Sequence, residues 1–185
     1  GATYGIHLWN AMAPLNHRQP GIVGAMLTND DAYVEVIGDM LHLHRAIVQL
    51  TIKAKSPQRV ALVTDTTGPA GLPKGKHLWN GQEVTVTSKD IRLADSTLAG
   101  SNMTNKQLLL SILSLGQSLK DTVQMRSAVP AKIIGHKAKG WGKLQVGKEA
   151  NISVLDKKMK TLLTIAQGKI TYPSSRTRLT ALFKS

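Results

Sequence analysis

The chain has 185 residues, of which 42% are hydrophobic and none is cysteine. This length favours one domain, or one and part of another, with a buried core. No run reaches the roughly 18 uncharged apolar residues of a membrane-spanning helix, so we expect no membrane span. The lack of cysteine excludes disulfides, thiolate nucleophiles and cysteine-based metal sites, and it fits a cytoplasmic protein. Residues 1–10 have no basic region and no initiator methionine, so they predict neither a signal peptide nor an intact natural start.

The formal net charge of +13 is unevenly distributed along the chain. Residues 1–100 hold nine Lys/Arg and eight Asp/Glu, whereas residues 101–185 hold fifteen and three. The second part, with a net charge of +12, therefore favours an anionic partner such as nucleic acid, an acidic protein or a membrane surface. A solvated lysine-rich surface explains the same charge.

Strand and helix patterns alternate over the first 65 residues. Apolar, β-rich runs at 4–8, 32–37 and 60–64 predict strands, and helical spacing predicts helices at 22–27 and 44–55. Strands that are apolar on both faces and joined by helices indicate a parallel sheet covered on both sides. The sequence therefore predicts an α/β fold.

Later segments predict a hairpin, three helices and a small antiparallel sheet. The hairpin is expected at 77–87 with Asn80-Gly81 in its turn. Helices are expected at 105–115, from the Ser118 cap to about Arg126, and from Pro130. Strands are expected at 151–155, 162–167 and 169–172, before a polar tail from Pro173.

Three polar side chains follow three successive predicted parallel strands: His7, His42 and Asp65. The carboxyl ends of such strands carry the catalytic groups in (β/α) barrels, so we expect a shared site. It could bind a divalent metal through imidazole and leave Asp65 to move a proton. Catalytic zinc usually has three protein ligands, however, and the chain offers no obvious set.

The sequence Asp-Thr-Thr-Gly at 65–68 also fits the loop of an aspartic protease or an aspartyl-phosphate enzyme. A protease dyad needs a second carboxylate in an equivalent context. The chain has no second copy of this motif, so the sequence gives little support to an aspartic protease.

The order of several short motifs resembles N-acetylglucosamine-6-phosphate deacetylases of the amidohydrolase superfamily. The motifs are HLWNAM (7–12), HRQPG (17–21), GDMLH (38–42), LVTD (62–65), TLAGS (97–101) and GKEAN (147–151). The resemblance covers residues 1 to about 172, and the order and approximate spacing of the motifs are kept.

The resemblance implies a role for each matching residue. His7 would ligate a divalent metal, expected to be zinc, and Asp65 would activate the hydrolytic water and later protonate the leaving amine. His42 would contact the substrate, a phosphorylated amino sugar. The remaining expected substrate-binding residues are Asn10 and Ala11 at the sugar phosphate, Arg18 at the phosphate across a dimer interface, and Leu98 at the sugar.

The resemblance also implies an architecture. Residues 1–146 would be strands six to eight of a (β/α)8 TIM barrel with their helices, 147–172 the carboxyl-terminal strands of a small β-sandwich domain, and 173–185 a basic tail. The reaction would be hydrolysis of N-acetylglucosamine 6-phosphate to glucosamine 6-phosphate and acetate. The other metal ligands and the first five strands would lie in a missing N-terminal half or in another chain.

A different class of function rests on the basic second part of the chain. Residues 132–148 hold five lysines, no acidic residue and Trp141, a composition suited to phosphate contacts and base stacking. The alternative is thus a non-catalytic, structural or RNA-associated subunit descended from the enzyme. Packing of Trp141 in a loop is the simpler explanation, and a scaffold has no need of His7, Asp65, His42 or Arg18.

Overall fold

A computed structural model describes residues 1–135 and 140–172 of the chain. It divides into two compact units, Gly1–Ile133 and Ile134–Ser185. No helix in the described part of the chain is long and apolar enough to span a membrane.

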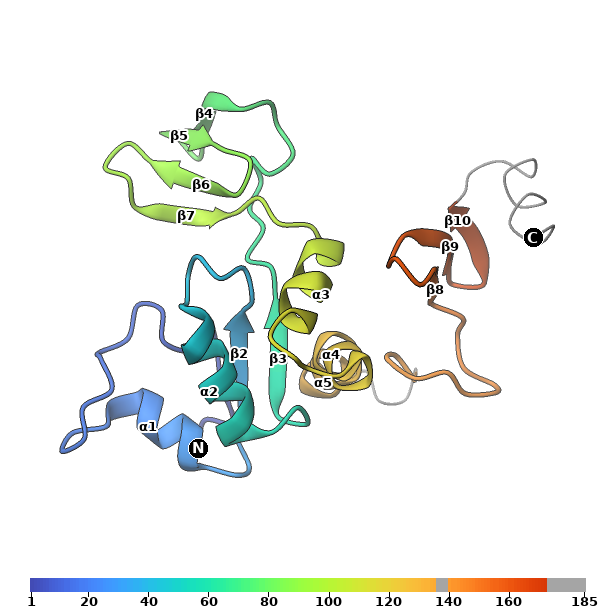
Figure 1. Ribbon diagram of the computed structural model, residues 1–185, viewed down its shortest axis with the longest axis horizontal. Coiled ribbons are helices and arrows are strands. Elements are labelled where there is room, and N and C mark those ends of the chain that lie inside the picture. The colour runs from blue at the N-terminus through green and yellow to red at the C-terminus, as the bar shows by residue number, and fades with distance from the viewer. Residues whose placement is uncertain (136–139, 173–185) are drawn as a thin grey trace. The chain divides into compact units, whose positions relative to one another are not determined.

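Three short parallel strands begin the first unit, in the order β1-β2-β3 (Figure 1). They are β1 (Tyr4–Gly5), β2 (Tyr33–Ile37) and β3 (Val60–Val63), linked by the helices α1 (Gly21–Thr28) and α2 (Arg45–Lys55). The register pairs Val34 with Val60 and Val36 with Leu62. This β-α-β-α-β order confirms the predicted α/β class and parallel sheet.

Valine and leucine side chains on one face of this sheet form the main core with the helices. Val34, Val36, Val60 and Leu62 pack with residues of α1, α2, α3 (Asn105–Leu113) and α4 (Leu119–Arg126). Gly38, which follows β2, lies against α3, because a Cβ there would meet Leu108 and Ile112 of α3. Burial on this face fixes the strands, and therefore fixes where their carboxyl ends lie.

The later helices begin at side-chain caps. Thr104 and Gln107 form a capping box at α3, and the Ser118 side chain accepts from the Asp121 N–H at α4. The predicted start and end of α4 are therefore confirmed. The next helix, α5 (Ala128–Ile133), begins two residues before the predicted start at Pro130. Proline is tolerated there because the first turn of a helix lacks intrahelical acceptors for its N–H groups.

A four-stranded antiparallel sheet lies between β3 and α3 in the sequence. It contains β4 (Gly75–Trp79), β5 (Gln82–Val86), β6 (Asp90–Leu93) and β7 (Leu98–Ser101). Asn80 and Gly81 have φ of 51° and 77°, as a tight hairpin turn requires, which confirms the predicted hairpin. The sequence patterns did not predict β6 and β7. Val84, Val86 and Ile91 form the core of this sheet.

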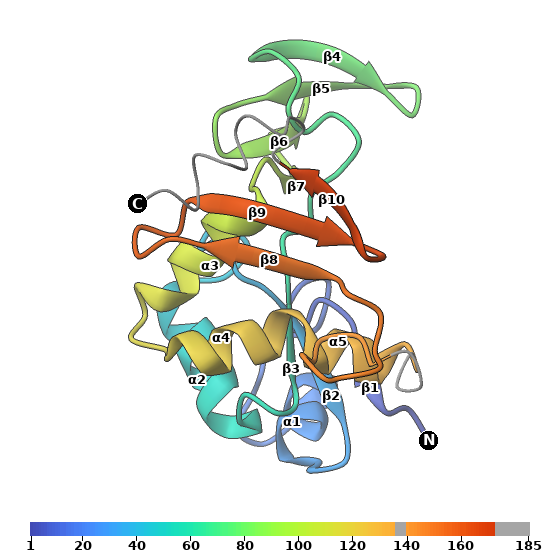
Figure 2. The ribbon, with the colours of Figure 1, turned by 90° about the vertical axis from the view of Figure 1, so that its right-hand side faces the viewer.

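The second unit holds the predicted antiparallel meander (Figure 2). Its strands are β8 (Ile152–Leu155), β9 (Thr161–Ala166) and β10 (Lys169–Tyr172), in the order β10-β9-β8. The predicted basic tail from 173, and Lys137 and Lys139 of the lysine-rich segment, lie outside the described residues.

Candidate active site at the carboxyl edge of the parallel sheet

The parallel strands place the predicted site residues at one edge of the sheet. His7 follows β1, Asp39 and His42 follow β2, and Asp65 follows β3. Strand β1 is shorter than predicted: residues 6–8 were expected in the strand, but His7 has a φ of 35°, which ends the extended backbone. Figure 1 shows the carboxyl ends of β2 and β3 directed toward the four-stranded sheet.

Two carboxylates flank the His42 imidazole. Its Nδ1 lies 2.7 Å from Oδ2 of Asp39, and its Nε2 lies 3.1 Å from Oδ2 of Asp65. The His42 side chain is 10% exposed and the Asp39 side chain 1%, whereas Asp65 is 42% exposed. The structure therefore joins two predicted site residues directly and leaves Asp65 open to a substrate.

The two carboxyl groups have opposite pKa shifts. Burial raises the pKa of Asp65, and the negative charges of Asp39 and Glu35 raise it further, against the opposing influence of His42 and His7. For Asp39, burial alone would raise the pKa. Hydrogen bonds from the His42 ring and from the N–H groups of His42 and Leu41 outweigh that effect and lower it. Asp39 is therefore the stable anion, and Asp65 is the group able to accept a proton.

Left-handed backbone is concentrated at this edge. The φ angles of His7, Trp9, Ala11, Met40 and Asp65 are 35°, 83°, 53°, 62° and 53°. Non-glycine residues adopt such angles at a cost and only where the surroundings hold them. Their position just after the three strands is typical of a functional site.

Glu35 in the middle of β2 holds His7 in place. Its Oε1 accepts the His7 backbone N–H at 3.0 Å, and its Oε2 accepts the Tyr4 hydroxyl. Sequence reasoning missed this residue. The available signal was a carboxylate between Val34 and Val36 in an otherwise apolar strand, where burial is costly unless the charge is paired.

The His7 ring fits a metal ligand. Its Nδ1 is buried and has no hydrogen-bond partner within residues 1–135 and 140–172, and a buried polar atom normally has one. A metal, or a further side chain, would supply the partner that Nδ1 of His7 lacks there. Among the described residues no three His, Cys, Asp or Glu side chains form a metal-binding cluster. The chain can therefore contribute to a metal site and cannot complete one from these residues.

The loop after β1 carries three predicted substrate-binding residues. Asn10 donates to the His7 carbonyl through its backbone N–H at 2.9 Å and through Nδ2 at 3.2 Å, and Ala11 follows in left-handed conformation. Trp9 connects the loop to α2, because its Nε1–H donates to Oγ1 of Thr51 in that helix at 2.8 Å. Asn10 and Ala11 therefore lie beside His7.

The structure does not bring Arg18 to this cluster. Arg18 is exposed, and in the described part of the chain its guanidinium forms no hydrogen bond or ion pair. Oδ1 of Asn16 accepts the backbone N–H groups of Arg18 and Gln19 and shapes the loop. The guanidinium is thus presented to solvent, a ligand or another subunit.

Strand β7 packs against the backbone of Asp65. The Ser101 N–H donates to the Asp65 carbonyl at 2.9 Å, and a Cβ on Gly100 would lie 3.0 Å from the same carbonyl oxygen. Leu98, half-buried, begins this strand. The Leu98 segment and the Asp65 loop are therefore held together.

Comparison with curated proteins identifies relatives that are deacetylases of phosphorylated amino sugars. N-acetylglucosamine-6-phosphate deacetylase of Bacillus subtilis is 33% identical over 94% of this chain and 44% of its own length. A provisionally named N-acetylgalactosamine-6-phosphate deacetylase of Escherichia coli K12 is 32% identical over 89% of this chain and 98% of its own length. No protein-family model matches the chain.

Solved structures give the same result. N-acetylglucosamine-6-phosphate deacetylase of Thermotoga maritima superposes with a TM-score of 0.85 at 32% identity, over 92% of this chain and 47% of that protein. A variant of the Mycobacterium smegmatis enzyme, in complex with N-acetyl-D-glucosamine-6-phosphate, superposes with a TM-score of 0.84 at 28% identity.

The chain spans less than half the length of most of these relatives. None of the four is named as a structural or RNA-binding subunit, so they do not favour that alternative. The sequence identity, the coverage of the Escherichia coli relative and the fold agree, and the chain belongs to the N-acetylglucosamine-6-phosphate deacetylase family.

Proposed function

We propose that this chain is the carboxyl-terminal part of a metal-dependent hydrolase that converts N-acetylglucosamine 6-phosphate to glucosamine 6-phosphate and acetate. The observation that carries the proposal is the placement of Asp65 beside His42, with a raised pKa and an open side chain, at the carboxyl edge of the parallel sheet. The names of the relatives give the substrate class.

Asp65 would perform the proton transfer. A raised pKa makes its carboxylate a better base toward the attacking water, and the acid so formed can then protonate the leaving amine. Its partly exposed side chain allows contact with both. His42 would orient the substrate from the same edge of the sheet, and its link to Asp39 holds the ring in place.

His7 would be this chain's ligand to a divalent metal, which we propose to be zinc. The buried Nδ1, which no described residue pairs with, and the backbone bond to Glu35 suit a held imidazole ligand. The bound metal would supply a Lewis acid for the amide. The remaining ligands would come from residues outside the described part of the chain, because the described residues hold no further set.

The substrate would lie over the loop after β1. Asn10 and Ala11 would hold the sugar phosphate and Leu98 would contact the sugar. The exposed guanidinium of Arg18 suits a phosphate, because its planar fork matches phosphate oxygens. We propose that Arg18 reaches the site of a second copy in a homodimer, since its guanidinium forms no hydrogen bond or ion pair with the described residues of its own chain.

We further propose that β1, β2 and β3 are strands six to eight of a TIM barrel, and that β8–β10 belong to a small β-sandwich domain. The domain limits stay as predicted, 1–146 and 147–172, with a basic tail at 173–185. Such a barrel has about 250 residues, so activity would require additional strands from a longer protein or another chain. A cytoplasmic location fits a chain without cysteine.

The experiment that tests this function uses the assembled enzyme and three substrates. N-acetylglucosamine 6-phosphate should be hydrolysed with equal release of acetate and glucosamine 6-phosphate, faster than its galactosamine epimer. Arg18→Ala should raise KM for the phosphorylated sugar and barely change the rate with unphosphorylated N-acetylglucosamine. Lack of acetate release by the wild-type enzyme would overturn the function. Equal losses on both substrates would show that Arg18 does not bind the phosphate.

A further inference from the structure

We propose that Asp39 is a positioning residue, which fixes the ring hydrogen of His42 on Nδ1 and so leaves Nε2, beside Asp65, without a hydrogen to donate. The inference rests on the proposed function, in which Asp65 transfers the proton. It adds a residue that acts through His42 and does not itself touch the substrate.

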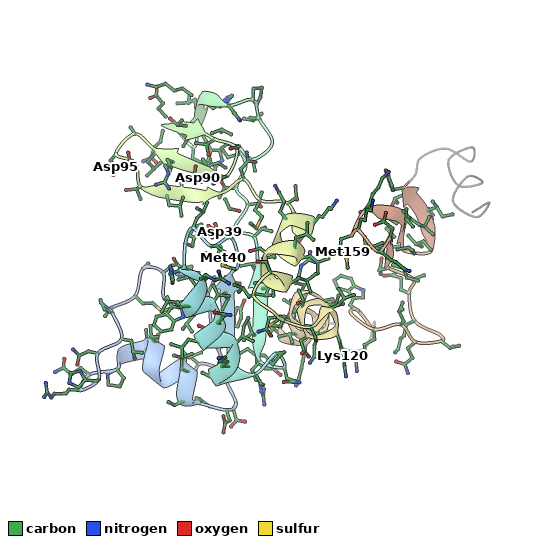
Figure 3. The ribbon with its side chains drawn as sticks, viewed as in Figure 1. Asp39, Met40, Asp90, Asp95, Lys120 and Met159 are labelled. Carbon is green, nitrogen blue, oxygen red and sulfur yellow. The ribbon has the colours of Figure 1, made fainter. Side chains whose placement is uncertain are left out.

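Both oxygens of the Asp39 carboxylate have hydrogen-bond partners among its neighbours. Oδ1 accepts the backbone N–H groups of Leu41 and His42, both at 2.9 Å, and Oδ2 lies 2.7 Å from Nδ1 of His42. With 1% of the side chain exposed, the carboxylate depends on these bonds because a buried, unpaired charge is costly. Figure 3 shows Asp39 and Met40 at the end of β2 nearest the four-stranded sheet.

An ionised carboxylate can only accept hydrogen bonds. Nδ1 of His42 must therefore carry a hydrogen, and in the neutral ring Nε2 then holds a lone pair. Nε2 lies 3.1 Å from Oδ2 of Asp65, without the alignment of a hydrogen bond. A ring hydrogen held on Nδ1 therefore leaves no ring N–H donor beside the Asp65 carboxylate.

The fixed tautomer affects how Asp65 can work. In the opposite tautomer, an Nε2–H beside the Asp65 carboxylate would stabilise its charged form and weaken it as a base. With the hydrogen on Nδ1, Nε2 offers no such donor, and the carboxylate stays the stronger base. The other charged or titratable groups that influence Asp65 are Glu35 from β2 and His7 after β1, and neither is bonded to the His42 ring.

The test is the tautomer of His42 in the full 185-residue chain, read by long-range ¹H–¹⁵N correlation NMR with ¹⁵N-labelled histidine. In the wild-type chain, Nδ1 should show the chemical shift of a protonated ring nitrogen and Nε2 that of an unprotonated one. A lone pair on Nδ1, or a hydrogen on Nε2, in the wild-type spectrum would overturn the inference without any variant.

Asp39→Asn is the sharpest perturbation. Asparagine keeps an oxygen for the Leu41 and His42 N–H groups, but it presents an NH2 group to Nδ1, so the hydrogen should move to Nε2. The control is Asp95→Asn, an exposed aspartate that also accepts a backbone N–H two residues on, from Thr97 at 2.9 Å. Asp95→Asn should leave the His42 shifts unchanged. An unchanged Nδ1–H signal in folded Asp39→Asn would contradict the assignment.

A kinetic measurement separates this inference from the proposed function. In the assembled enzyme, Asp39→Asn should lower kcat about 10- to 100-fold, as loss of the carboxylate that orients a metal-bound histidine does, with little change in KM. A tautomer switch with no deacetylation by the wild-type enzyme would support the inference and refute the function. A tautomer switch with unchanged kcat would overturn the role of Asp39 in catalysis.

Discussion

Replacing Gly38 with alanine tests whether the packing of α3 sets the position of the active-site edge. Gly38 follows β2 immediately before Asp39. An added Cβ would lie 2.5 Å from Cδ1 of Leu108 and 3.1 Å from Cδ1 of Ile112. Both side chains are at most 1% exposed, so neither has free space to enter.

The expected loss can be estimated from these contacts. Overpacking a filled core costs about 1–3 kcal/mol, and the reduced freedom of the unfolded chain returns about 0.4–1 kcal/mol. Gly38→Ala should therefore lower the free energy of unfolding by about 1–2 kcal/mol. Gly5→Ala is the matched comparison, because its Cβ would meet the flexible end of Met26 at 3.0 Å. It should cost less than Gly38→Ala.

The assay is urea denaturation at one protein concentration, extended to a double-mutant cycle. Leu108→Ala alone should cost about 2–5 kcal/mol. Combined with Gly38→Ala it should cost less than the sum by about 0.5–3 kcal/mol, because the shortened side chain makes room for the new methyl group. Strict additivity, or an equal loss in Gly5→Ala, would refute the packing explanation.

Three further predictions concern the metal, acid stability and association. His7→Ala in the assembled enzyme should lower both metal content and rate, because a ligand is deleted; full metal retention measured by elemental analysis would contradict the assignment. Because the pKa of Asp39 is lowered in the folded chain, its ionised carboxylate stabilises the fold at pH values above the ordinary pKa of 3.8. This stabilisation is lost as the pH falls through the lower folded pKa. Acid titration followed by circular dichroism should therefore show a weaker acid transition in Asp39→Asn, and an unchanged profile would contradict it. The chain alone should associate, because Ile6 and Leu78 are 56% and 79% exposed; a compact monomer in sedimentation would contradict this.

The regular elements followed from local patterns. Buried valine and leucine runs predicted β2 and β3, Asn80-Gly81 predicted the first hairpin, and Ser118 predicted the start of α4. These features are local because strand burial, turn conformation and helix capping each depend on a few neighbouring residues.

Two features escaped prediction because distant contacts create them. The pairing of β6 with β7 shifts register between Asp90 and Arg92, and the short segments show no clear alternation. The shortening of β1 depends on the left-handed backbone of His7, which Glu35 supports from a neighbouring strand. A residue's own neighbours in sequence carry no sign of such a bond.

Some members of the candidate site were predictable from the sequence, and the contacts between them were less so. Polar residues after successive strands indicated that His7, His42 and Asp65 share an edge, since parallel strands end together. The Asp39 contact with His42 needs a turn in which Met40 has a φ of 62°. The local sequence does not predict this left-handed conformation at a methionine. Three assignments stay predictions: the binding of phosphate by Arg18, the bound metal and the second subunit.

The role of Asp65 is tested most directly by Asp65→Asn in the assembled enzyme, with acetate release and metal content measured on the same sample. Asparagine keeps the size and polarity of the side chain and removes the basic oxygen. Acetate release from N-acetylglucosamine 6-phosphate should fall by roughly 10²- to 10⁴-fold, the usual loss of general acid–base catalysis, while the metal content stays at the wild-type value. Wild-type rates in the variant, or loss of the metal with activity that added zinc does not restore, would contradict proton transfer by Asp65.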